Sequence, residues 1–538
     1  MTRRQWRLLS AGAFVCLAVA LLPAAAGAHP GDGQCPVTAT VTSPDASWFT
    51  GSGSCLDAAA VRDTSRTTLA RPAPAAAKTG TFKQIGHEPL LNRGMNAAIA
   101  VSGDYAYIGS RTDAHAGMPT GGIMVVDVSR PSQPELLGEP LDPKPGESTR
   151  ELRVWQSQHI LIVLNTNCGV GPTLHHCTQP SISNFRFYDI AGANARHPKL
   201  VNEFKVDTHE FFLWQDPANP ERALIFAGDA ASTCATRGGA PSCPFSVWDI
   251  SPVRDGKEPV TLFTGPHGFS ESSATQTPTG ALHSLTVTND GRTAYFALLT
   301  GGFAVIDTTD FAEGAPAPMP HLITANDARP FWAGPGAHSA IKLWGRKWVW
   351  VSDEVYGTAT GPGHGCPWGW ARIVDIANPQ APVVKAEYRT PENDPATCSS
   401  WDPPHTSYSA HNPTLTPHIA FSTWHSSGLQ AVSLDDPRHP YQLAEFTPKP
   451  LGSVLLEDGR LSSDADTGRN EKVVMWSYAV VKDGLIYVVD LRNGLYVLQY
   501  RGPHAAEVDR IRFLDGNSNQ GDALCYDPVG AAPRGCGR

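Results

Sequence analysis

One short β-rich segment occurs seven times along the 538-residue chain, and this repetition restricts the possible folds more than any other feature. In the first five copies the segment carries an aspartate, which Ser433 and Gln499 replace in the last two. Successive copies lie 62, 60, 58, 68, 58 and 66 residues apart. The seven segments are 121–128, 185–190, 245–250, 301–308, 371–376, 428–434 and 494–500. This pattern predicts an all-β fold, a seven-bladed β-propeller of four-stranded antiparallel blades.

The other strands of each repeat also leave signals in the sequence. In the fourth repeat, two β-rich runs flank Asn289-Asp290-Gly291, which is typical of a tight turn. The fourth strands begin beside a proline, which a sheet tolerates at its outer edge. The seventh repeat lacks a fourth strand after Tyr500, and segment 81–89 (TFKQIGHEP) has the sequence expected of the missing one. We therefore expect an N-terminal strand to complete the last blade and close the ring.

The repeated aspartate has two possible roles. Its side chain can accept a hydrogen bond from the backbone two residues further on and so cap a turn, or it can take part in catalysis. A turn role is favoured, because aspartate at the end of a strand commonly makes this local bond. The five positions are Asp127, Asp189, Asp249, Asp307 and Asp375.

These strands resemble the LVIVD-repeat family of extracellular β-propeller proteins. The likeness lies in segments 124–127 (MVVD), 247–250 (VWDI), 304–307 (AVID) and 373–376 (IVDI), and it extends over roughly 81–500. The resemblance implies a propeller fold and export from the cell. It implies no particular activity, because propellers host many functions.

The first residues predict a secretory signal peptide, residues 1–28. Arg3, Arg4 and Arg7 precede an apolar run at 8–22, and Ala26-Gly27-Ala28 is a small-residue cleavage site. No second apolar run follows, so we expect a secreted, extracellular protein without a membrane span. Cleavage would change the formal net charge from −9 to −12 (−9 − 3). Such an acidic chain is a poor nucleic-acid binder.

The cysteines fit an exported chain. Cys16 leaves with the signal peptide, and the remaining ten fall in neighbouring pairs, which predicts five disulfides although the sequence does not fix their connectivity. The pairs are Cys35 with Cys55, Cys168 with Cys177, Cys234 with Cys243, Cys366 with Cys398, and Cys525 with Cys536. The expected organisation is a disulfide-containing arm with an Ala/Pro linker at 29–80, the propeller at 81–503, and a bridged C-terminal tail at 504–538.

Four histidines occupy the same position in consecutive repeats. The first strand of each repeat is the innermost strand of a blade and lines the central channel, so equivalent positions should converge on the propeller axis. The seven equivalent residues are Asn96, Arg150, His209, His283, His338, His411 and Trp476. Four converging imidazoles predict a transition-metal site, with copper or iron expected first and zinc or manganese also possible. The alternative is that these histidines only form internal hydrogen bonds.

Other polar residues are expected near the same end of the channel. Three cysteine pairs lie between second and third strands, and such bridged loops would build a wall around the channel mouth. Glu210, Glu271 and Glu354 are candidates for acid–base catalysis or for orienting the histidines. Arg150, His425 and Trp476 are candidates for binding substrate.

Three functions remain open from the sequence. The first is a secreted metal-dependent oxidoreductase that uses copper or iron and binds a small molecule at this face. The second is a non-catalytic propeller that binds an extracellular ligand or protein there. The third is a structural module. In architecture only, the four histidines resemble those of the carotenoid-cleaving oxygenases and of the copper propellers of the selenium-binding group.

Overall fold

The chain divides into two units, Met1–Pro36 and Val37–Arg538, and every residue described here belongs to the second. The computed structural model describes residues 78–513, together with the backbone of 62–63 and 524–526. Gaps fall at 112–120, 145–146, 168–182, 207, 209, 229–243, 267–281, 299–301, 326–327, 329, 332–335, 355–367, 395, 397–407 and 457–472. In the described part of the chain, no helix has the length and apolar character needed to span a bilayer.

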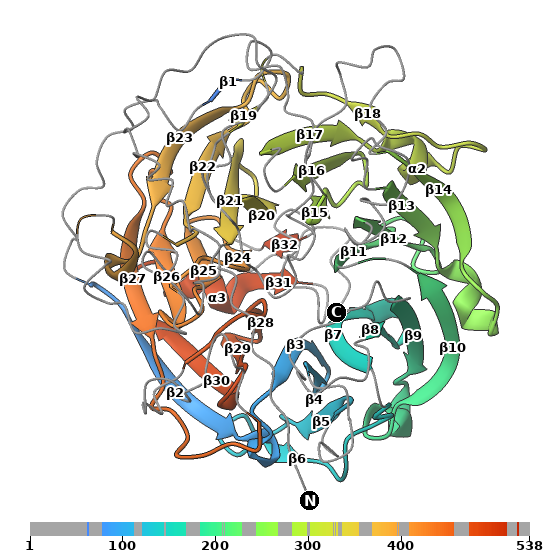
Figure 1. Ribbon diagram of the computed structural model, residues 1–538, viewed down its shortest axis with the longest axis vertical. Helices are drawn as coiled ribbons and strands as arrows, with labels where there is room; N and C mark the ends of the chain where they lie inside the picture. The colour runs from blue at the N-terminus through green and yellow to red at the C-terminus, as the bar shows by residue number, and fades with distance from the viewer. Residues whose placement is uncertain are drawn as a thin grey trace, which may run out of the picture. The chain divides into compact units, whose positions relative to one another are not determined.

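The fold is all-β and propeller-like, built from four-stranded antiparallel sheets that follow one another along the chain (Figure 1). Four such sheets consist of strands consecutive in sequence. They are β11 (Glu210–Gln215), β12 (Ala223–Gly228), β13 (Pro244–Asp249) and β14 (Val260–Pro266); β15 (Ser284–Val287), β16 (Thr293–Ala297), β17 (Phe303–Asp307) and β18 (His321–Leu322); β20 (Gly336–Lys342), β21 (Trp348–Glu354), β22 (Ala371–Asp375) and β23 (Val383–Tyr388); β24 (Pro413–Leu415), β25 (Ile419–Thr423), β26 (Leu429–Ser433) and β27 (Tyr441–Phe446).

Two further sets of four strands are joined into an eight-stranded sheet through Ser110 and Thr149, which pair β4 with β7. The first set is β3 (Asn96–Ser102), β4 (Tyr105–Ser110), β5 (Met124–Asp127) and β6 (Glu135–Leu136). The second is β7 (Glu147–Trp155), β8 (Ile160–Asn167), β9 (Ser183–Asp189) and β10 (Lys199–Val206).

The last four-stranded sheet joins distant parts of the chain. It contains β28 (Val480–Lys482), β29 (Leu485–Asp490) and β30 (Gly494–Arg501), and its fourth strand is the N-terminal β2 (Thr81–Glu88). β2 pairs antiparallel with β30 from Thr81↔Arg501 to Glu88↔Leu495, so this predicted pairing is confirmed. A bulge in this ladder lies next to Gly86, which packs closely against the first set. A Cβ atom added at this position would lie only 2.1 Å from the carbonyl oxygen of Pro131.

The remaining elements are short. Two small sheets pair β1 (Arg62–Asp63) with β19 (Pro330–Phe331) and β31 (Ile511–Phe513) with β32 (Leu524–Tyr526). The helices are α2 (Thr309–Glu313) and α3 (Ala505–Arg510), with 3-10 turns η2 (Leu90–Asn92), η3 (Gln156–Gln158), η4 (Gly192–Ala195), η5 (Ser251–Asp255) and η7 (Pro391–Asn393).

The repeated aspartate caps a turn in all five copies, as predicted. Its Oδ1 accepts a hydrogen bond from the backbone N–H two residues later, at 2.8–2.9 Å. The donors are Ser129, Ala191, Ser251, Thr309 and Ala377. In the sixth repeat Ser433 makes the same contact more weakly, because the N–H of Asp435 lies 3.4 Å from its Oγ.

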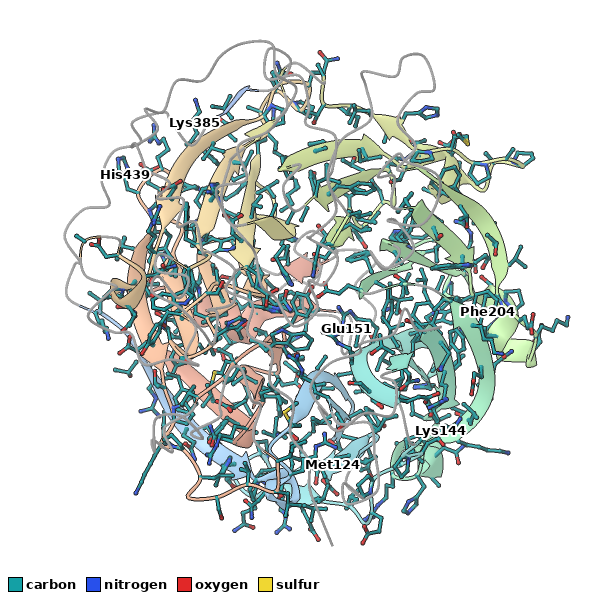
Figure 2. The ribbon with its side chains drawn as sticks, in the orientation of Figure 1. Met124, Lys144, Glu151, Phe204, Lys385 and His439 are labelled. Carbon is teal, nitrogen blue, oxygen red and sulfur yellow. The ribbon has the colours of Figure 1, made fainter. Side chains whose placement is uncertain are left out.

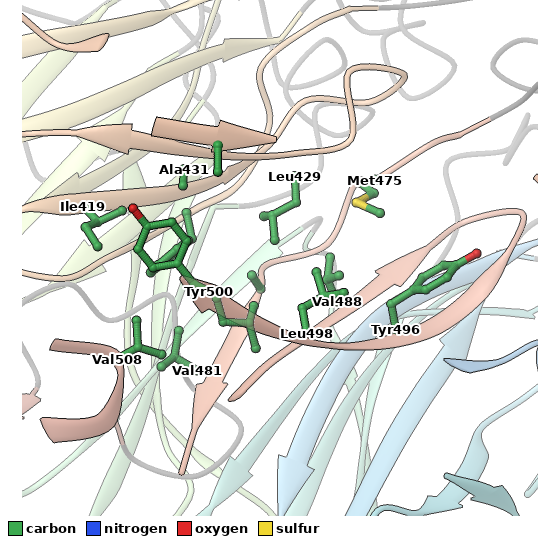
Figure 3. Packing of buried hydrophobic residues seen from close by; sticks show 14 of the residues in the cluster. Ile419, Leu429, Ala431, Met475, Val481, Val488, Tyr496, Leu498, Tyr500 and Val508 are labelled. Carbon is green, nitrogen blue, oxygen red and sulfur yellow. The ribbon is translucent and has the colours of Figure 1, made fainter. Parts of the chain in front are cut away.

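Hydrophobic side chains pack between successive sets of strands rather than at one central core. One cluster lies between β25–β27 and β28–β30, where Phe421, Leu429, Val488 and Leu498 are buried (Figure 3). Equivalent clusters lie between the other neighbouring sets, and one of them joins Ile99 of β3 and Val126 of β5 to Val489 of β29.

The first strands of the sets contact one another in turn: β3 with β7, β7 with β11, β11 with β15, β15 with β20, and β20 with β24. β28 contacts β3 in the same way. Figure 2 shows Glu151 of β7 among these first strands, whereas Phe204 of β10 and Lys385 of β23 lie toward the outside. The first strands therefore bring their polar side chains together.

Candidate functional site

A chain of hydrogen bonds between neighbouring first strands aligns the equivalent positions. At three of these positions, the next residue in sequence donates a side-chain hydrogen bond to the carbonyl oxygen of the equivalent residue in the next set. Ser339, after His338, bonds the carbonyl of His411 at 3.0 Å. Asn412, after His411, lies 3.3 Å from the carbonyl of Trp476. The Ser284 hydroxyl contacts the carbonyl of His338 in the same manner. A buried Ser or Asn after His283, His338 and His411 thus holds these neighbouring segments in register.

Two of the first strands carry a β-bulge at this same position. His338 is the extra residue between the paired Ala337 and Ser339 of β20. Arg150 is the extra residue between the paired Thr149 and Glu151 of β7. Bulges often lie beside functional sites because the unpaired residue takes a new direction.

Three of the four predicted histidines lie together. The ring centroids of His283 and His338 are 3.9 Å apart, and those of His338 and His411 are 4.1 Å apart. All three side chains are at most 4% exposed. The fourth, His209, lies outside the described residues.

Two carboxylates share this space with the imidazoles. Glu210 Oε1 lies 3.6 Å from His338 Nε2, and Glu210 Oε2 lies 3.9 Å from His283 Nδ1. On the other side, Glu354 places Oε2 3.5 Å from His338 Nε2 and Oε1 2.9 Å from His411 Nε2. We call His283, His338, His411, Glu210 and Glu354 the histidine cluster.

The histidine cluster contains two overlapping sets of potential metal ligands. One is Glu210, His283 and His338, and the other is His338, Glu354 and His411. In each set the ligand atoms lie within 4.8 Å of one another. Atoms bound about 2.0–2.2 Å from one ion lie roughly 3–4.5 Å apart, so small side-chain movements would suffice to bind a metal.

The two carboxyl groups differ in their protonation. Burial, reinforced by the negative charge of Glu151, raises the pKa of Glu210 well above its usual range, although Arg153 opposes this. Burial would also raise the pKa of Glu354, but the charges of His411 and His338 and hydrogen bonds from His411 and His425 hold it well below its usual range. Two carboxyl groups with opposite pKa shifts therefore flank His338, the raised pKa on Glu210 and the lowered pKa on Glu354.

Arginines and a tryptophan adjoin the histidine cluster. The Trp476 ring lies 4.9 Å from that of His411. The guanidinium carbons of Arg111 and Arg150 lie 5.3 and 5.5 Å from the Trp476 ring centroid. Arg153 lies 3.1 Å from Glu151 in a buried ion pair. The surroundings of the cluster are thus cationic on the side of β4, β7 and Trp476.

Several of the predicted site residues can be placed. Glu210 and Glu354 were expected as acid–base or orienting groups, and they lie as close to the imidazoles as a ligand would. His425 was expected to bind substrate; it is fully buried, with Nε2 3.2 Å from Glu354 Oε1. In this position His425 supports Glu354, and its expected role in binding substrate stays a prediction.

The remaining predicted residues cannot be placed. Glu271 lies outside the described residues. Cys525 lies in β32, but its side chain is not described. None of the other nine cysteines of the predicted pairs belongs to the described part of the chain, so all five disulfides stay predictions. These nine are Cys35, Cys55, Cys168, Cys177, Cys234, Cys243, Cys366, Cys398 and Cys536.

The sequence interpretation missed Arg111 and Arg153. It placed Glu354 and His425 near the channel mouth, and Arg111 stands at an equivalent place. All three lie at or just after the ends of second strands, which are β21, β25 and β4. An alignment of these second-strand ends would have grouped the three residues.

A family model for the LVIVD repeat matches residues 93–141 and 371–390. The first match spans β3 to β6, and the second spans β22 and β23. Both contain the aspartate that caps the turn, Asp127 or Asp375. A search of the curated proteins finds no match to the chain. The resemblance to the LVIVD repeat, predicted from the strand sequences, is confirmed in these two segments of the chain.

Proposed function

We propose that the histidine cluster binds a transition-metal ion and that the protein is a metal-dependent oxidoreductase. The observation that carries the proposal is the packing of three buried imidazoles against two carboxyl groups, with the ligand atoms of each set within 4.8 Å. Burying several titratable side chains together lowers the stability of the folded protein, so such a group is unexpected where it has no function. A metal ion would compensate much of this cost, because it binds the nitrogen and oxygen lone pairs directly.

The donor atoms favour iron over copper. Each of the two overlapping sets has two histidines and one glutamate. Two imidazoles and one carboxylate with open positions are the usual ligands of non-haem iron(II) oxygenases. His209, which directly precedes Glu210 in the sequence, would add a fourth imidazole. An iron ion held there would supply the redox chemistry; zinc and manganese also accept this donor set.

The residues around the cluster would divide the remaining tasks. Glu354, ionised, is the better ligand of the two carboxyl groups. Glu210, whose pKa burial raises well above its usual range, would be the group that donates a proton to a bound molecule. Arg150 and Trp476 would contact the substrate, joined by Arg111. Guanidinium groups beside an aromatic ring favour a substrate with an anionic group.

The proposed scaffold is a closed propeller of seven four-stranded blades. It is supported by the hydrophobic clusters between successive sets and by the one that joins β3–β5 to β28–β30. The pairing of β2 with β30 supports closure by the N-terminal strand. The same proposal includes secretion after removal of residues 1–28 and the formation of five disulfides. Both rest on the sequence alone.

Replacing His338 tests metal binding most directly, because this residue belongs to both ligand sets. Iron(II) is titrated anaerobically into the full chain and into the His338→Ala variant, and bound iron is counted after gel filtration. The variant should bind one equivalent of iron fewer than the wild type. As a matched control, His321→Ala removes an exposed imidazole that lies 3.8 Å from Asp310, outside both ligand sets, and this variant should bind iron as the wild type does. Equal binding by wild type and His338→Ala would refute the site.

Nitric oxide tests whether a bound iron keeps a position open for a reactant. Added to the iron(II)-loaded protein, it should give the EPR signal of a high-spin iron–nitrosyl complex, and His338→Ala should abolish that signal. A protein that binds iron but gives no such signal would have a saturated coordination shell. The oxidoreductase proposal would then give way to a non-catalytic propeller that binds an extracellular ligand.

A further inference from the structure

A second group of histidines lies at the opposite end of a strand from the histidine cluster. His411 precedes β24, whereas His418 lies in the turn that follows β24 and leads to β25. There it meets His504 and Glu507, which stand just before and within helix α3. We propose that His418, His504 and Glu507, here called the C-terminal cluster, form a separate zinc-binding site.

One carboxylate oxygen faces two imidazole nitrogens in the C-terminal cluster. Glu507 Oε1 contacts His418 Nδ1 and lies 3.6 Å from His504 Nδ1. The two rings are stacked, with centroids 4.7 Å apart and planes inclined by 17°. The ligand atoms of the three residues lie within 4.8 Å of one another. Two nitrogens and one oxygen thus lie close enough that small side-chain movements would let them bind one ion.

Outer contacts orient two of the three ligands. The second nitrogen of His504, Nε2, lies 2.7 Å from Asp435 Oδ1, so the aspartate fixes the tautomer in which Nδ1 can bind a metal. A carboxylate that accepts the other N–H of a histidine is the usual outer partner of a zinc ligand. The second oxygen of Glu507, Oε2, accepts hydrogen bonds from Thr416 Oγ1 at 2.7 Å and from the backbone N–H of His418 at 3.1 Å.

The backbone at His504 also suggests a functional constraint. His504 has φ 58° and ψ 16°, in the left-handed region that residues other than glycine seldom adopt. Such a conformation persists only where surrounding contacts hold it. Here it places the imidazole over His418, with Nδ1 toward Glu507.

The donors and their exposure select the class of ion. Two histidines and one glutamate are an established zinc-ligand set that leaves a fourth position for water. The His418 and His504 side chains are 39% and 30% exposed, so water can reach that position, whereas Glu507 is buried. A bound zinc ion would tie the start of α3 to the turn between β24 and β25. The site does not depend on the proposed function of the histidine cluster.

Cobalt(II), whose visible absorption reports tetrahedral coordination, is the probe for the test. It is titrated into the metal-free full chain, and zinc is then added in competition. The His504→Ala variant should bind one equivalent fewer than the wild type and lose the tetrahedral absorption. Asp435→Asn should weaken cobalt binding by about 10- to 100-fold while leaving the ligands in place. His439→Ala, the control, removes an exposed histidine that contacts Asp436 and should change nothing.

The outcomes separate the zinc site from a purely structural hydrogen-bond chain. If wild type and His504→Ala bind the same number of cobalt ions, or if Asp435→Asn binds as tightly as the wild type, the proposal is wrong. Should His504→Ala fail to fold, the affinity of Asp435→Asn decides alone. The same titration in a His338→Ala background isolates this site, since that substitution removes only metal bound by the histidine cluster.

Discussion

His338 has the central place among the residues of the histidine cluster. Its Nε2 lies between Glu210 at 3.6 Å and Glu354 at 3.5 Å, and its ring contacts both His283 and His411. The two glutamates have opposite pKa shifts for a physical reason. Glu354 faces three imidazoles, whereas Glu210 also experiences the negative charges of Glu151 and Glu354.

Glu354→Gln should destabilise the metal-free protein by about 3 kcal/mol at pH 7, because it removes the ionised partner of buried histidines. The pKa of Glu354 is lower in the folded than in the unfolded protein, so its ionisation stabilises the fold above the usual glutamate pKa. That contribution is lost as the pH falls through the folded value. Urea unfolding at a series of pH values should show the difference from wild type shrinking in acid. A constant difference would contradict the assignment.

Glu210→Gln should have the opposite pH dependence. Since the pKa of Glu210 is raised in the folded protein, the wild type loses stability as the pH rises from the usual glutamate pKa toward the folded value. Glutamine does not titrate, so the variant should lack this loss and become relatively more stable with rising pH. The measurement is again the free energy of unfolding of the metal-free protein. A variant whose stability falls with pH as steeply as that of the wild type would show that Glu210 is already ionised.

Individual strands and turns show which elements the sequence could predict. Alternating β-rich runs and the aspartate at their ends are local patterns, so the strands and the five capped turns were predicted. The convergence of His283, His338 and His411 followed from the repeat, because equivalent residues of neighbouring blades face the same axis. Glu354 and His425 were expected near the same end of the channel, but the approach of Arg111 was missed, because it depends on where the second strand β4 ends and on a side chain that reaches between blades.

Asp375→Ala should destabilise the protein by about 1 kcal/mol, since the backbone N–H of Ala377 loses its acceptor at 2.8 Å. Asp375→Asn keeps an acceptor oxygen at this position and should destabilise the protein clearly less than Asp375→Ala does. Thermal unfolding of both variants at neutral pH compares the two effects. Equal losses would mean that the charge of the aspartate, rather than its hydrogen bond, stabilises the turn.

Across the whole molecule, stability is spread over the interfaces between sets of strands. The N-terminal β2 contributes to this pattern by covering the edge of β30 through a full ladder. A chain that begins at residue 90 leaves this edge exposed, and exposed edges associate. We expect such a chain to unfold at a lower temperature and to form larger species in light scattering. A chain that begins at residue 79 keeps β2 and should behave as the wild type; if both truncations behave alike, β2 is dispensable.

The pairing of β2 with β30 also links folding to the order of synthesis. The ribosome makes residues 81–88 among the first strands and their partner, 494–501, nearly last. The early strand must therefore wait, unpaired, until almost the entire chain is available. A chain that ends before β30 offers β2 no pairing partner, so we expect proteases to attack such a chain more readily than the full-length protein. The β2–β30 ladder can therefore form only in a chain that has been made almost to residue 501.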